Sequence, residues 1–308
     1  MTGVQTCALP ILSFKSGYIA IVGLPNSGKS TLLNRLLERS LAIVSNKPQT
    51  TRNQILGIRH LQDAQLLFLD TPGWYEGKLK LDACFRDEIK SALVDADLIL
   101  FLLDGRKPKL RDTRTYFEIV RNSSKAEIFL LVTKIDALKQ TNLISLLTDL
   151  PEKFSEATEI VPISSKDDTN LKTLQELVLS RLPEGPAYYP EDSLTDRPHT
   201  FLFCEFLRES YIDLLDEELP YSMAVACEEL EESEKSLKVS LTIFVERPTQ
   251  KAILIGESGI MLSEVKRRTC IRARKFFTKK VLLDVWIKVK RNWRRDSTVL
   301  QKLGYRPK

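Results

Sequence analysis

One stretch near the N-terminus, GLPNSGKS from Gly23 to Ser30, limits what this chain can fold into more than any other. It follows an apolar, β-branched run at 18–22 and precedes a helical pattern at 30–39. A G-x-x-x-x-G-K-S segment between a strand and a helix is typical of a phosphate-binding loop, whose backbone N–H groups point at phosphate oxygens. The N-terminus of the following helix adds a potential that favours anions. The sequence therefore predicts an α/β domain that binds nucleotide phosphates here; a chance glycine-rich turn is the alternative.

The side chains of this loop predict its chemistry. Lys29 is placed to reach the β- and γ-phosphates, and the hydroxyl of Ser30 to ligate Mg²⁺. Charge neutralisation by Lys29 and Mg²⁺ would be the main catalytic contribution. Further nucleotide contacts are expected from Gly23, Pro25, Asn26, Ser27, Gly28 and Thr31.

Beyond the loop, short apolar runs alternate with helical patterns as far as residue 182. The expected strands are 18–22, 65–69, 98–103, 128–132 and 159–163, and the expected helices are 30–39, 82–94, 112–121 and 170–182. Such alternation predicts a mixed, mainly parallel sheet with helices on both faces. Residues 182–198 hold four prolines and a glycine, which predicts a linker before a second domain.

A second phosphate signal, DTPG from Asp70 to Gly73, directly follows the strand 65–69. Ligands of open α/β sheets bind at the C-terminal ends of the strands. Asp70 is placed there to hold Mg²⁺ through a water, with Thr71 and Pro72 in contact with the nucleotide. The N–H of Gly73 would sense a γ-phosphate, which makes the following segment a switch. An ordinary strand-ending turn is the alternative.

Two further segments predict a preference for guanine. TKID (133–136) ends the strand 128–132, and the carboxylate of Asp136 can accept both N–H donors that guanine presents side by side. Thr133 and Lys134 would support this contact. SSK after the last strand is placed to offer backbone N–H groups to the guanine oxygen, and it comprises Ser164, Ser165 and Lys166.

Charge is divided unevenly along the chain. Residues 246–308 carry 18 Lys and Arg against 5 Asp and Glu, a net charge of +13, whereas the whole chain carries +5 and residues 1–245 therefore carry −8. This end also contains GESG, a G-x-x-G loop formed by Gly256, Glu257, Ser258 and Gly259. A basic domain of this kind predicts a polyanionic partner, with a merely solvated basic surface as the alternative.

The composition excludes several other classes of site. Five scattered cysteines with no C-x-x-C argue against a disulfide framework or a zinc site. Only two histidines, His60 and His199, are present, so a histidine triad is not expected. The most apolar run, 98–103, is too short to cross a membrane. The first dozen residues fit neither a signal peptide nor the α/β pattern, and we exclude them from the fold argument.

The motifs in this order resemble the Era family of translation-factor-related GTPases. The resemblance also rests on NKPQTTR (46–52), EELPYSMAV (217–225) and VERPTQKAILIG (245–256) and covers about residues 17–295. It implies a P-loop GTPase domain followed by an α+β type II KH domain, with segments assigned as 1–16 (non-native or disordered), 17–182 (GTPase), 183–198 (linker), 199–295 (KH) and 296–308 (basic tail).

The resemblance also implies residue roles and partners. Thr51 would contact Mg²⁺ and the γ-phosphate, which makes it a catalytic candidate beside Lys29 and Gly73, and Asn26 would hold K⁺ near the phosphates. The KH domain would bind the 3′ region of small-subunit ribosomal RNA and so assist assembly of the 30S subunit. Its RNA contacts are expected from the G-x-x-G loop and from Lys266, Arg267, Arg268, Arg272 and Lys275, with Arg274 on the same helix.

Four positions depart from patterns that are common in GTPases or in KH domains. Thr133 stands where the family usually has Asn, which predicts a lower nucleotide affinity, and Glu257 puts a negative charge in a loop that is usually basic. Trp74 occupies the position where well-studied GTPases carry the Gln that orients the attacking water, which predicts slow intrinsic hydrolysis. Ser165 replaces a more usual alanine with little expected effect.

Two other functions remain open at this stage. A membrane-associated signalling GTPase would use the basic C-terminus against anionic lipid, although no amphipathic helix with a wide apolar face supports it. A nucleotide-dependent scaffold without useful turnover is the second. We expect a monomer that acts in the cytoplasm, with peripheral association at the inner face of the cell membrane left open.

Overall fold

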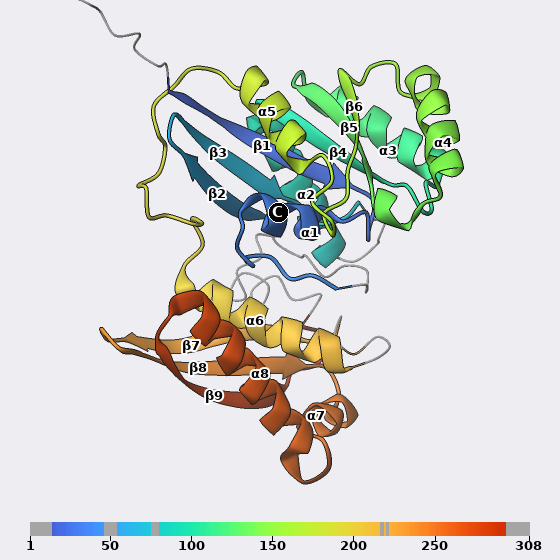
Figure 1. Ribbon diagram of the computed structural model, residues 1–308. Coiled ribbons are helices and arrows are strands. Elements are labelled where there is room, and N and C mark those ends of the chain that lie inside the picture. The colour runs from blue at the N-terminus through green and yellow to red at the C-terminus, as the bar shows by residue number, and fades with distance from the viewer. Residues whose placement is uncertain (1–13, 46–53, 75–79, 216–218, 220–221, 294–308) are drawn as a thin grey trace, which may run out of the picture.

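The computed structural model describes residues 14–45, 54–74, 80–215, 219 and 222–293, without the side chains of 80–85. Two bodies lie one above the other, joined by an irregular linker along one side (Figure 1). The upper body is built on a six-stranded sheet and the lower on a three-stranded sheet. None of the helices in the described part of the chain is long and apolar enough to cross a membrane.

The upper sheet has the strand order β2-β3-β1-β4-β5-β6. Only β2 is antiparallel to its neighbour, and the other pairs are parallel. The predicted mixed, mainly parallel sheet is therefore confirmed. The strands are β1 (Lys15–Gly23), β2 (Ile55–Leu61), β3 (Ala64–Asp70), β4 (Leu98–Asp104), β5 (Glu127–Thr133) and β6 (Glu159–Pro162).

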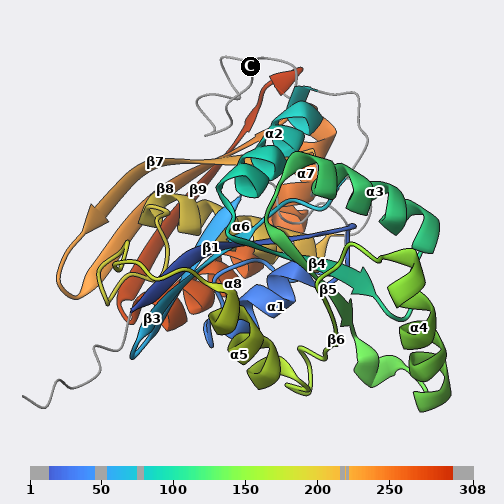
Figure 2. The same ribbon diagram turned by 90° about the horizontal axis from the view of Figure 1, so that it is seen from above.

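Helices cover both faces of this sheet. Figure 2 shows α1 and α5 on one side and α2 and α3 on the other. Each face has its own buried apolar cluster, because the central strands are apolar on both sides. The helices are α1 (Lys29–Leu36), α2 (Lys80–Asp95), α3 (Leu110–Ser123), α4 (Gln140–Lys153) and α5 (Leu171–Arg181).

The structure corrects the sequence-based assignment in three places. β2 forms a hairpin with β3, and α4 lies between β5 and β6; neither was expected. α4 escaped notice because Leu150 is its only buried residue, so its apolar period is weak. β1 begins at Lys15, within the segment assigned as non-native or disordered, because Lys15 and Ser16 still pair with β3. Residues 1–13 lie outside the described residues.

The linker is fastened to the upper body. The N–H of Ile58 on the edge strand β2 donates to the carbonyl of Leu194 at 2.9 Å. Gln65 is fully buried, and its side-chain oxygen accepts from the N–H groups of Tyr188 (2.7 Å) and Tyr189 (3.0 Å). The linker therefore covers an exposed sheet edge and satisfies a buried amide.

The lower body has the order helix, strand, strand, helix, helix, strand that the resemblance implied. β8 lies between an antiparallel β7 and a parallel β9. Alternate residues of β8 are buried in the same apolar cluster as residues of α6 and α8. The elements are α6 (His199–Leu214), β7 (Ala224–Glu232), β8 (Ser236–Val245), α7 (Pro248–Ile255), α8 (Ile260–Phe277) and β9 (Lys280–Val289).

Candidate functional site

The predicted nucleotide segments meet at the C-terminal edge of the upper sheet. The phosphate loop follows β1, DTPG follows β3, TKID follows β5 and SSK follows β6. β1, β3, β5 and β6 run parallel to one another or to the shared neighbour β4, so their carboxyl ends lie at one edge. Gly23, Pro25, Asn26, Ser27, Gly28 and Thr31 all lie in the loop or the first turn of α1.

Lys29 lies inside the phosphate loop. Its ammonium donates to the carbonyls of Gly23 (3.2 Å) and Leu24 (3.1 Å), and the residue is buried. Burial lowers the pKa of Lys29 to about 8, against the opposing attraction of Asp70. A phosphate in this loop would supply the negative charge that a buried ammonium requires.

The two residues predicted to ligate the metal also come together. The hydroxyl of Ser30 donates to the carboxylate of Asp70 at 2.7 Å, so two hard oxygen ligands of opposite segments converge. Thr71 instead turns inward, where its hydroxyl donates to the carbonyl of Ile21 at 2.8 Å. The third predicted metal contact, Thr51, lies outside the described residues.

Gly73 rests against the phosphate loop. A Cβ at this position would lie 2.9 Å from the Cα of Pro25, closer than packed atoms tolerate. Any larger residue would therefore push the start of the switch segment away from the loop. The close approach is consistent with the predicted role of the Gly73 N–H beside a γ-phosphate.

Thr133, at the position where the resembled family usually has Asn, braces the phosphate loop. Its buried hydroxyl lies 2.7 Å from the carbonyl of Ser27 and 3.1 Å from that of Leu103. A hydroxyl has one proton, so it donates to one of these carbonyls at a time. An Asn amide would carry two N–H donors, and Thr133 therefore retains the brace but gives up the second donor.

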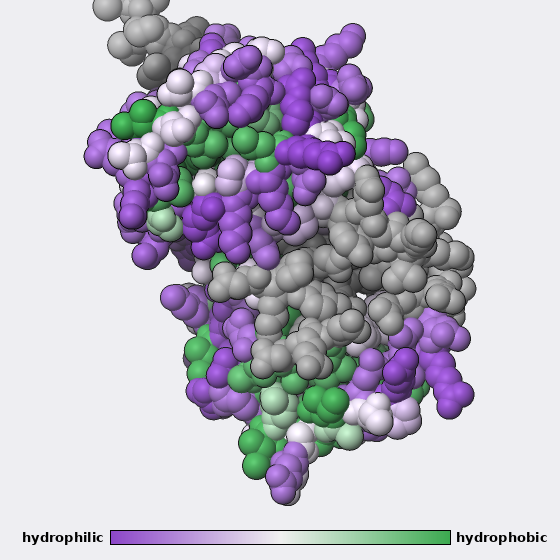
Figure 3. Space-filling view, turned by 90° about the vertical axis from the view of Figure 1, so that its right-hand side faces the viewer, coloured by the Kyte–Doolittle hydropathy of each residue, from purple (hydrophilic) through white to green (hydrophobic). Residues whose placement is uncertain are grey.

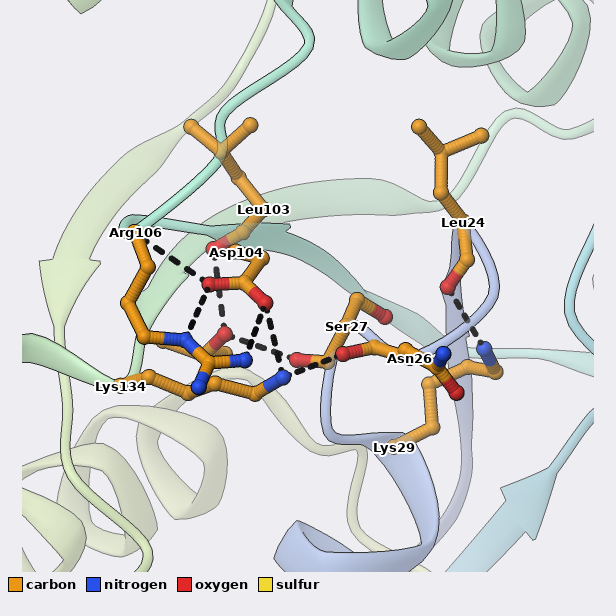
Figure 4. A network of polar contacts seen from close by, with 9 residues as sticks. Leu24, Asn26, Ser27, Lys29, Leu103, Asp104, Arg106 and Lys134 are labelled. Atoms are coloured by element: carbon orange, nitrogen blue, oxygen red, sulfur yellow. Dashed lines mark hydrogen bonds and ion pairs between the residues drawn. The ribbon is translucent and has the colours of Figure 1, made fainter. Parts of the chain in front are cut away.

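Asp104, which the sequence analysis did not single out, anchors the base-binding segment (Figure 4). Its carboxylate accepts from Lys134 at 2.7 Å and from Arg106 at 3.1 Å, and Lys134 also donates to the carbonyl of Asn26. Burial disfavours the charged form of Asp104, but the hydrogen bonds from Arg106 and Lys134 outweigh this and lower its pKa. Its position at the carboxyl end of a buried parallel strand was the available signal.

The side chain of Ser164 orients Asp136, although Ser164 was expected to act through its backbone N–H. The hydroxyl of Ser164 donates to the Asp136 carboxylate at 2.8 Å and accepts from the N–H of Lys166 at 3.2 Å. The second carboxylate oxygen and the free lone pairs of the first remain for a base. Ser165 is half-buried, and Lys166 is exposed on the same turn.

Trp74 stacks on Tyr116 of α3, with ring centroids 4.9 Å apart and an interplanar angle of 21°. Both rings line a cavity of about 830 Å³ beside the phosphate loop. Burial raises the pKa of Tyr116, and its hydroxyl has no hydrogen-bond partner among the described residues. The residue that replaces the usual Gln is thus held by an aromatic contact on α3 rather than by a polar one.

The G-x-x-G loop joins α7 to α8 with a tight turn. Gly256 has φ 73°, and a Cβ there would lie 2.6 Å from that of Met261, so the position requires glycine. A Cβ added at Gly259 would meet no atom within 4 Å, and the side chains of Glu257 and Ser258 are exposed. Hydrophobic side chains gather at this lower end of the body (Figure 3), and they include the exposed Ile253 and Ile260.

The predicted RNA-contacting cations divide into two groups along α8. Lys266 lies 3.5 Å from Asp284, and Arg267 and Arg268 both donate to Glu264 at 2.7 Å; these residues lie within three turns of the loop. Arg272 and Lys275 lie at the far end of the helix. The structure therefore does not bring all the predicted cations to the loop.

The far group faces the GTPase body. Arg272 donates to Glu209 of α6 at 3.0 Å and lies over the ring of Phe206, with its guanidinium carbon 5.1 Å from the ring centroid. Arg272 and Lys275 line a cavity with residues of α1 and α5. Because an 18-residue helix carries its last turns about 20 Å from its first, these two residues lie away from the G-x-x-G loop, and their role in RNA binding stays a prediction.

Comparison with known proteins agrees with this geometry. Residues 18–134 match the family described as 50S ribosome-binding GTPase, and residues 218–294 match the KH domain family. The chain is 40% identical to GTPase Era of Clostridium tetani, over 95% of this chain and 99% of that protein. It is 37% identical to GTPase Era of Heliobacterium modesticaldum, over 94% and 97%.

Solved structures give the same result along the whole chain. A crystal structure of Era in complex with MgGDPNP and nucleotides 1506–1542 of 16S ribosomal RNA has a TM-score of 0.90 and 37% identity, covering 95% of this chain and 99% of that one. A variant of Aquifex aeolicus Era bound to GDP and AlF4⁻ has a TM-score of 0.90 and 36% identity, covering 95% and 100%. With its guanine-nucleotide segments assembled at one sheet edge and a KH domain behind them, the chain belongs to the Era family of GTPases.

Proposed function

We propose that this GTPase uses GTP binding and hydrolysis to control how its KH domain binds the 3′ region of small-subunit ribosomal RNA during assembly of the 30S subunit. The observation that carries this is the presence, on one chain, of a braced guanine-nucleotide site and an open G-x-x-G loop. The solved relative that holds 16S ribosomal RNA supports the small subunit as the target, although the matched family description names the large one.

Mg²⁺ fits the residues present. The Ser30 hydroxyl and the Asp70 carboxylate, 2.7 Å apart, would hold the ion, with Asp70 acting through a water and Thr51 as a further proposed contact. A bound Mg²⁺ supplies positive charge that stabilises the transferring phosphoryl group. Lys29 adds its own charge from inside the loop, and Gly73 lies close enough to report on the γ-phosphate. The relative bound to MgGDPNP supports this assignment.

Hydrolysis has to proceed without a Gln at position 74. Trp74 has no group that holds a water as an amide does, so we propose that K⁺ near Asn26 takes the place of an arginine finger. The solved relative with GDP and AlF4⁻ supports a hydrolytic role for the fold. The steady-state GTPase rate is expected to be several-fold higher in KCl than in NaCl at equal ionic strength. Equal rates in the two salts would refute the role of K⁺.

RNA binding is tested on the full chain by fluorescence anisotropy. The labelled RNA matches the small-subunit 3′ end, and a scrambled RNA and a salt series run beside it. The variant Gly259→Asp adds a charge where the structure has open space, and Gly259→Asn is its neutral, equally shaped control. Gly259 has φ 81°, which strains any side chain, and Asp and Asn are among the residues that adopt such angles most often, so the two variants carry a similar strain.

We expect wild-type protein to prefer the matched RNA at moderate salt. Gly259→Asp is expected to weaken this binding about tenfold, and Gly259→Asn by much less, because the added carboxylate repels phosphates. Glu257→Lys is expected to tighten it, since Glu257 is exposed on the same loop. Equal binding of matched and scrambled RNA, lost as salt rises, would refute sequence-selective binding.

The remaining assignments are also proposals. We propose a monomer that acts in the cytoplasm on the 30S subunit. The competing role as a membrane-associated switch without RNA specificity is tested by sedimentation with anionic liposomes. If the full chain sediments with liposomes but does not distinguish matched from scrambled RNA, that role replaces the one proposed here.

A further inference from the structure

Trp74, the first residue after DTPG, is held at two points. Its backbone N–H donates to the carbonyl of Gly23 in the phosphate loop at 3.4 Å, and its ring stacks on Tyr116 of α3 with the centroids 4.9 Å apart. The hydrogen bond is long and therefore weak, so the ring contact provides most of the hold. Because Gly73 rests against Pro25, these contacts fix the start of the switch segment between the phosphate loop and α3.

Tyr116 is a rigid platform for the indole. Its side chain is buried and packs on Phe101 of β4, with the ring centroids 5.4 Å apart. Phe101 packs edge-on against Phe117, and Phe117 packs edge-on against Phe154, with the centroids 5.2 Å apart in both pairs. All three phenylalanines are fully buried. A ring enclosed in this way keeps its position, because a closely packed interior leaves little room for another rotamer.

Trp74, in contrast, is only half-buried. Its ring lines the cavity of about 830 Å³ beside Pro25 and Asn26 of the phosphate loop. An indole released from Tyr116 would be free to turn within this cavity, and the backbone at Gly73 would move with it. A single aromatic contact shifts such a conformational equilibrium by about twofold to tenfold.

We propose that Tyr116 is a positioning residue for GTP hydrolysis, which keeps the indole of Trp74 against α3 and thereby holds the N–H of Gly73 at the γ-phosphate. The proposal rests on the proposed role of that N–H. Tyr116 acts through Trp74 and does not itself contact the nucleotide. When the indole leaves α3, a smaller fraction of the bound GTP has its γ-phosphate stabilised, so kcat falls in proportion. GDP has no γ-phosphate, and its affinity is therefore independent of the stack.

The test measures kcat for GTP and the affinity for GDP on the full chain. Tyr116→Leu removes the ring but keeps an apolar side chain, whereas Tyr116→Phe keeps the ring and is the conservative variant. Phe117→Leu is the matched control, because Phe117 is a fully buried ring of the same helix that packs on Phe101 and Phe154. Circular dichroism and urea denaturation establish that each variant is folded.

Tyr116→Leu is expected to lower kcat about threefold to tenfold, while its GDP affinity stays within about twofold of that of wild-type protein. Tyr116→Phe is expected to retain the wild-type kcat, since the hydroxyl takes no part in the stack. Phe117→Leu is expected to be destabilised to a similar extent but to hydrolyse GTP at the wild-type rate. An unchanged kcat in folded Tyr116→Leu, an equal loss of kcat in Phe117→Leu, or an equal loss in Tyr116→Phe would overturn the proposal.

The partner residue supplies an independent test. Trp74→Ala removes a half-buried ring, which a folded domain tolerates more easily than a core change, and it is expected to lower kcat about as much as Tyr116→Leu does. Adding Tyr116→Leu to Trp74→Ala is expected to change kcat by less than about twofold, because no indole is left to position. A wild-type kcat in Trp74→Ala, or losses that multiply in the double variant, would contradict the positioning role.

The wild-type rate separates failure of this role from failure of the proposed function. If wild-type protein turns over GTP and the variants of Trp74 and Tyr116 match it, only the positioning role is refuted. If wild-type protein shows no multiple turnover in a phosphate-release assay, the proposed hydrolytic switch itself fails.

Discussion

At the scale of single residues, Thr133 shows how a departure from the family pattern is accommodated. Its hydroxyl replaces one of the two N–H donors of an Asn amide, because it still reaches the carbonyl of Ser27 in the phosphate loop. The lower affinity predicted from the sequence should therefore come from the missing second donor alone. The brace itself is separately testable.

Thr133→Val keeps the shape of the side chain but removes the hydroxyl. We expect it to weaken GDP binding about tenfold, or ~1.4 kcal/mol, because the buried carbonyl of Ser27 loses its donor. Thr133→Ser is the control and should bind nearly as wild-type protein does. Titration calorimetry measures both, and an unchanged affinity in Thr133→Val would show that the brace does not support the nucleotide.

Lys29 makes nucleotide affinity depend on pH. Its pKa in the free protein is lowered to about 8 by burial, and bound phosphates would raise it again. Binding therefore favours the protonated form, so affinity is fully present below pH 8 and declines as the pH rises through that value. We expect GDP to bind about fourfold more weakly at pH 8.5 than at pH 7.

Lys29→Arg provides the comparison for this pH dependence. Arginine stays charged throughout this range, so its affinity, although altered, should not change between these two pH values through position 29. Stopped-flow or calorimetric titration at both pH values gives the ratio for each protein. If the two proteins show the same ratio, another group is responsible.

At the scale of elements, the linker behaves as a strap on the GTPase domain rather than a free connection. Its backbone satisfies the buried amide of Gln65 and pairs with the edge strand β2 at Ile58. An irregular segment can stay in place in this way because its polar groups find partners on the sheet. The strap also sets where the KH domain begins relative to β2 and β3.

Replacing Gln65 tests the strap. Gln65→Met leaves the N–H groups of Tyr188 and Tyr189 without their acceptor and should lower the unfolding free energy by about 2–4 kcal/mol. Gln62→Met, an exposed residue of the adjoining hairpin turn, is the matched control and should have little effect. Urea denaturation measures the loss, and faster hydrogen exchange at 188–189 would locate it. Similar stability of the two variants would show that the linker is not held by this amide.

At the scale of the whole molecule, the two domains come together near Glu209 of α6 in the KH domain. Glu209 accepts from Arg272 of the same domain at 3.0 Å, and the backbone of Val44, two residues before the undescribed stretch 46–53, lies close enough to lower its pKa. Burial raises the pKa of Glu209, against the opposing effect of Arg272. The KH domain thus lies beside the chain that leads to Thr51, the residue expected to contact the γ-phosphate.

Glu209→Gln would break this ion pair while keeping its shape. We expect the difference in RNA affinity between the GTP-analogue and GDP states to shrink toward none, because Arg272 no longer has a charged partner linked to Val44. Glu264→Gln, which breaks an exposed ion pair of α8 within the KH domain, is the control and should preserve that difference. Anisotropy in both nucleotide states gives the two ratios, and a wild-type difference in Glu209→Gln would argue against this link.

Much of the nucleotide site could be predicted because its chemistry lies in short contiguous segments. GLPNSGKS, DTPG, TKID and SSK each carry their own donors or acceptors, and the rule that parallel strands end at one edge brings them together. The alternation of strands and helices likewise predicted the sheet class. β2 was missed because Gly57, Arg59 and His60 interrupt its apolar run, and α4 because it has one buried residue and so little apolar period.

The sequence by itself thus determined the class of nucleotide, the two-domain order and the presence of a G-x-x-G loop, all of which depend on neighbours along the chain. Only the tertiary structure decided which side chains support that site. Asp104 accepts from Lys134, Ser164 donates to Asp136, and Tyr116 stacks on Trp74. It also decided that Arg272 and Lys275 face the GTPase domain. These contacts join segments far apart in sequence, and distance through space is a property of the packed chain, which no local pattern encodes.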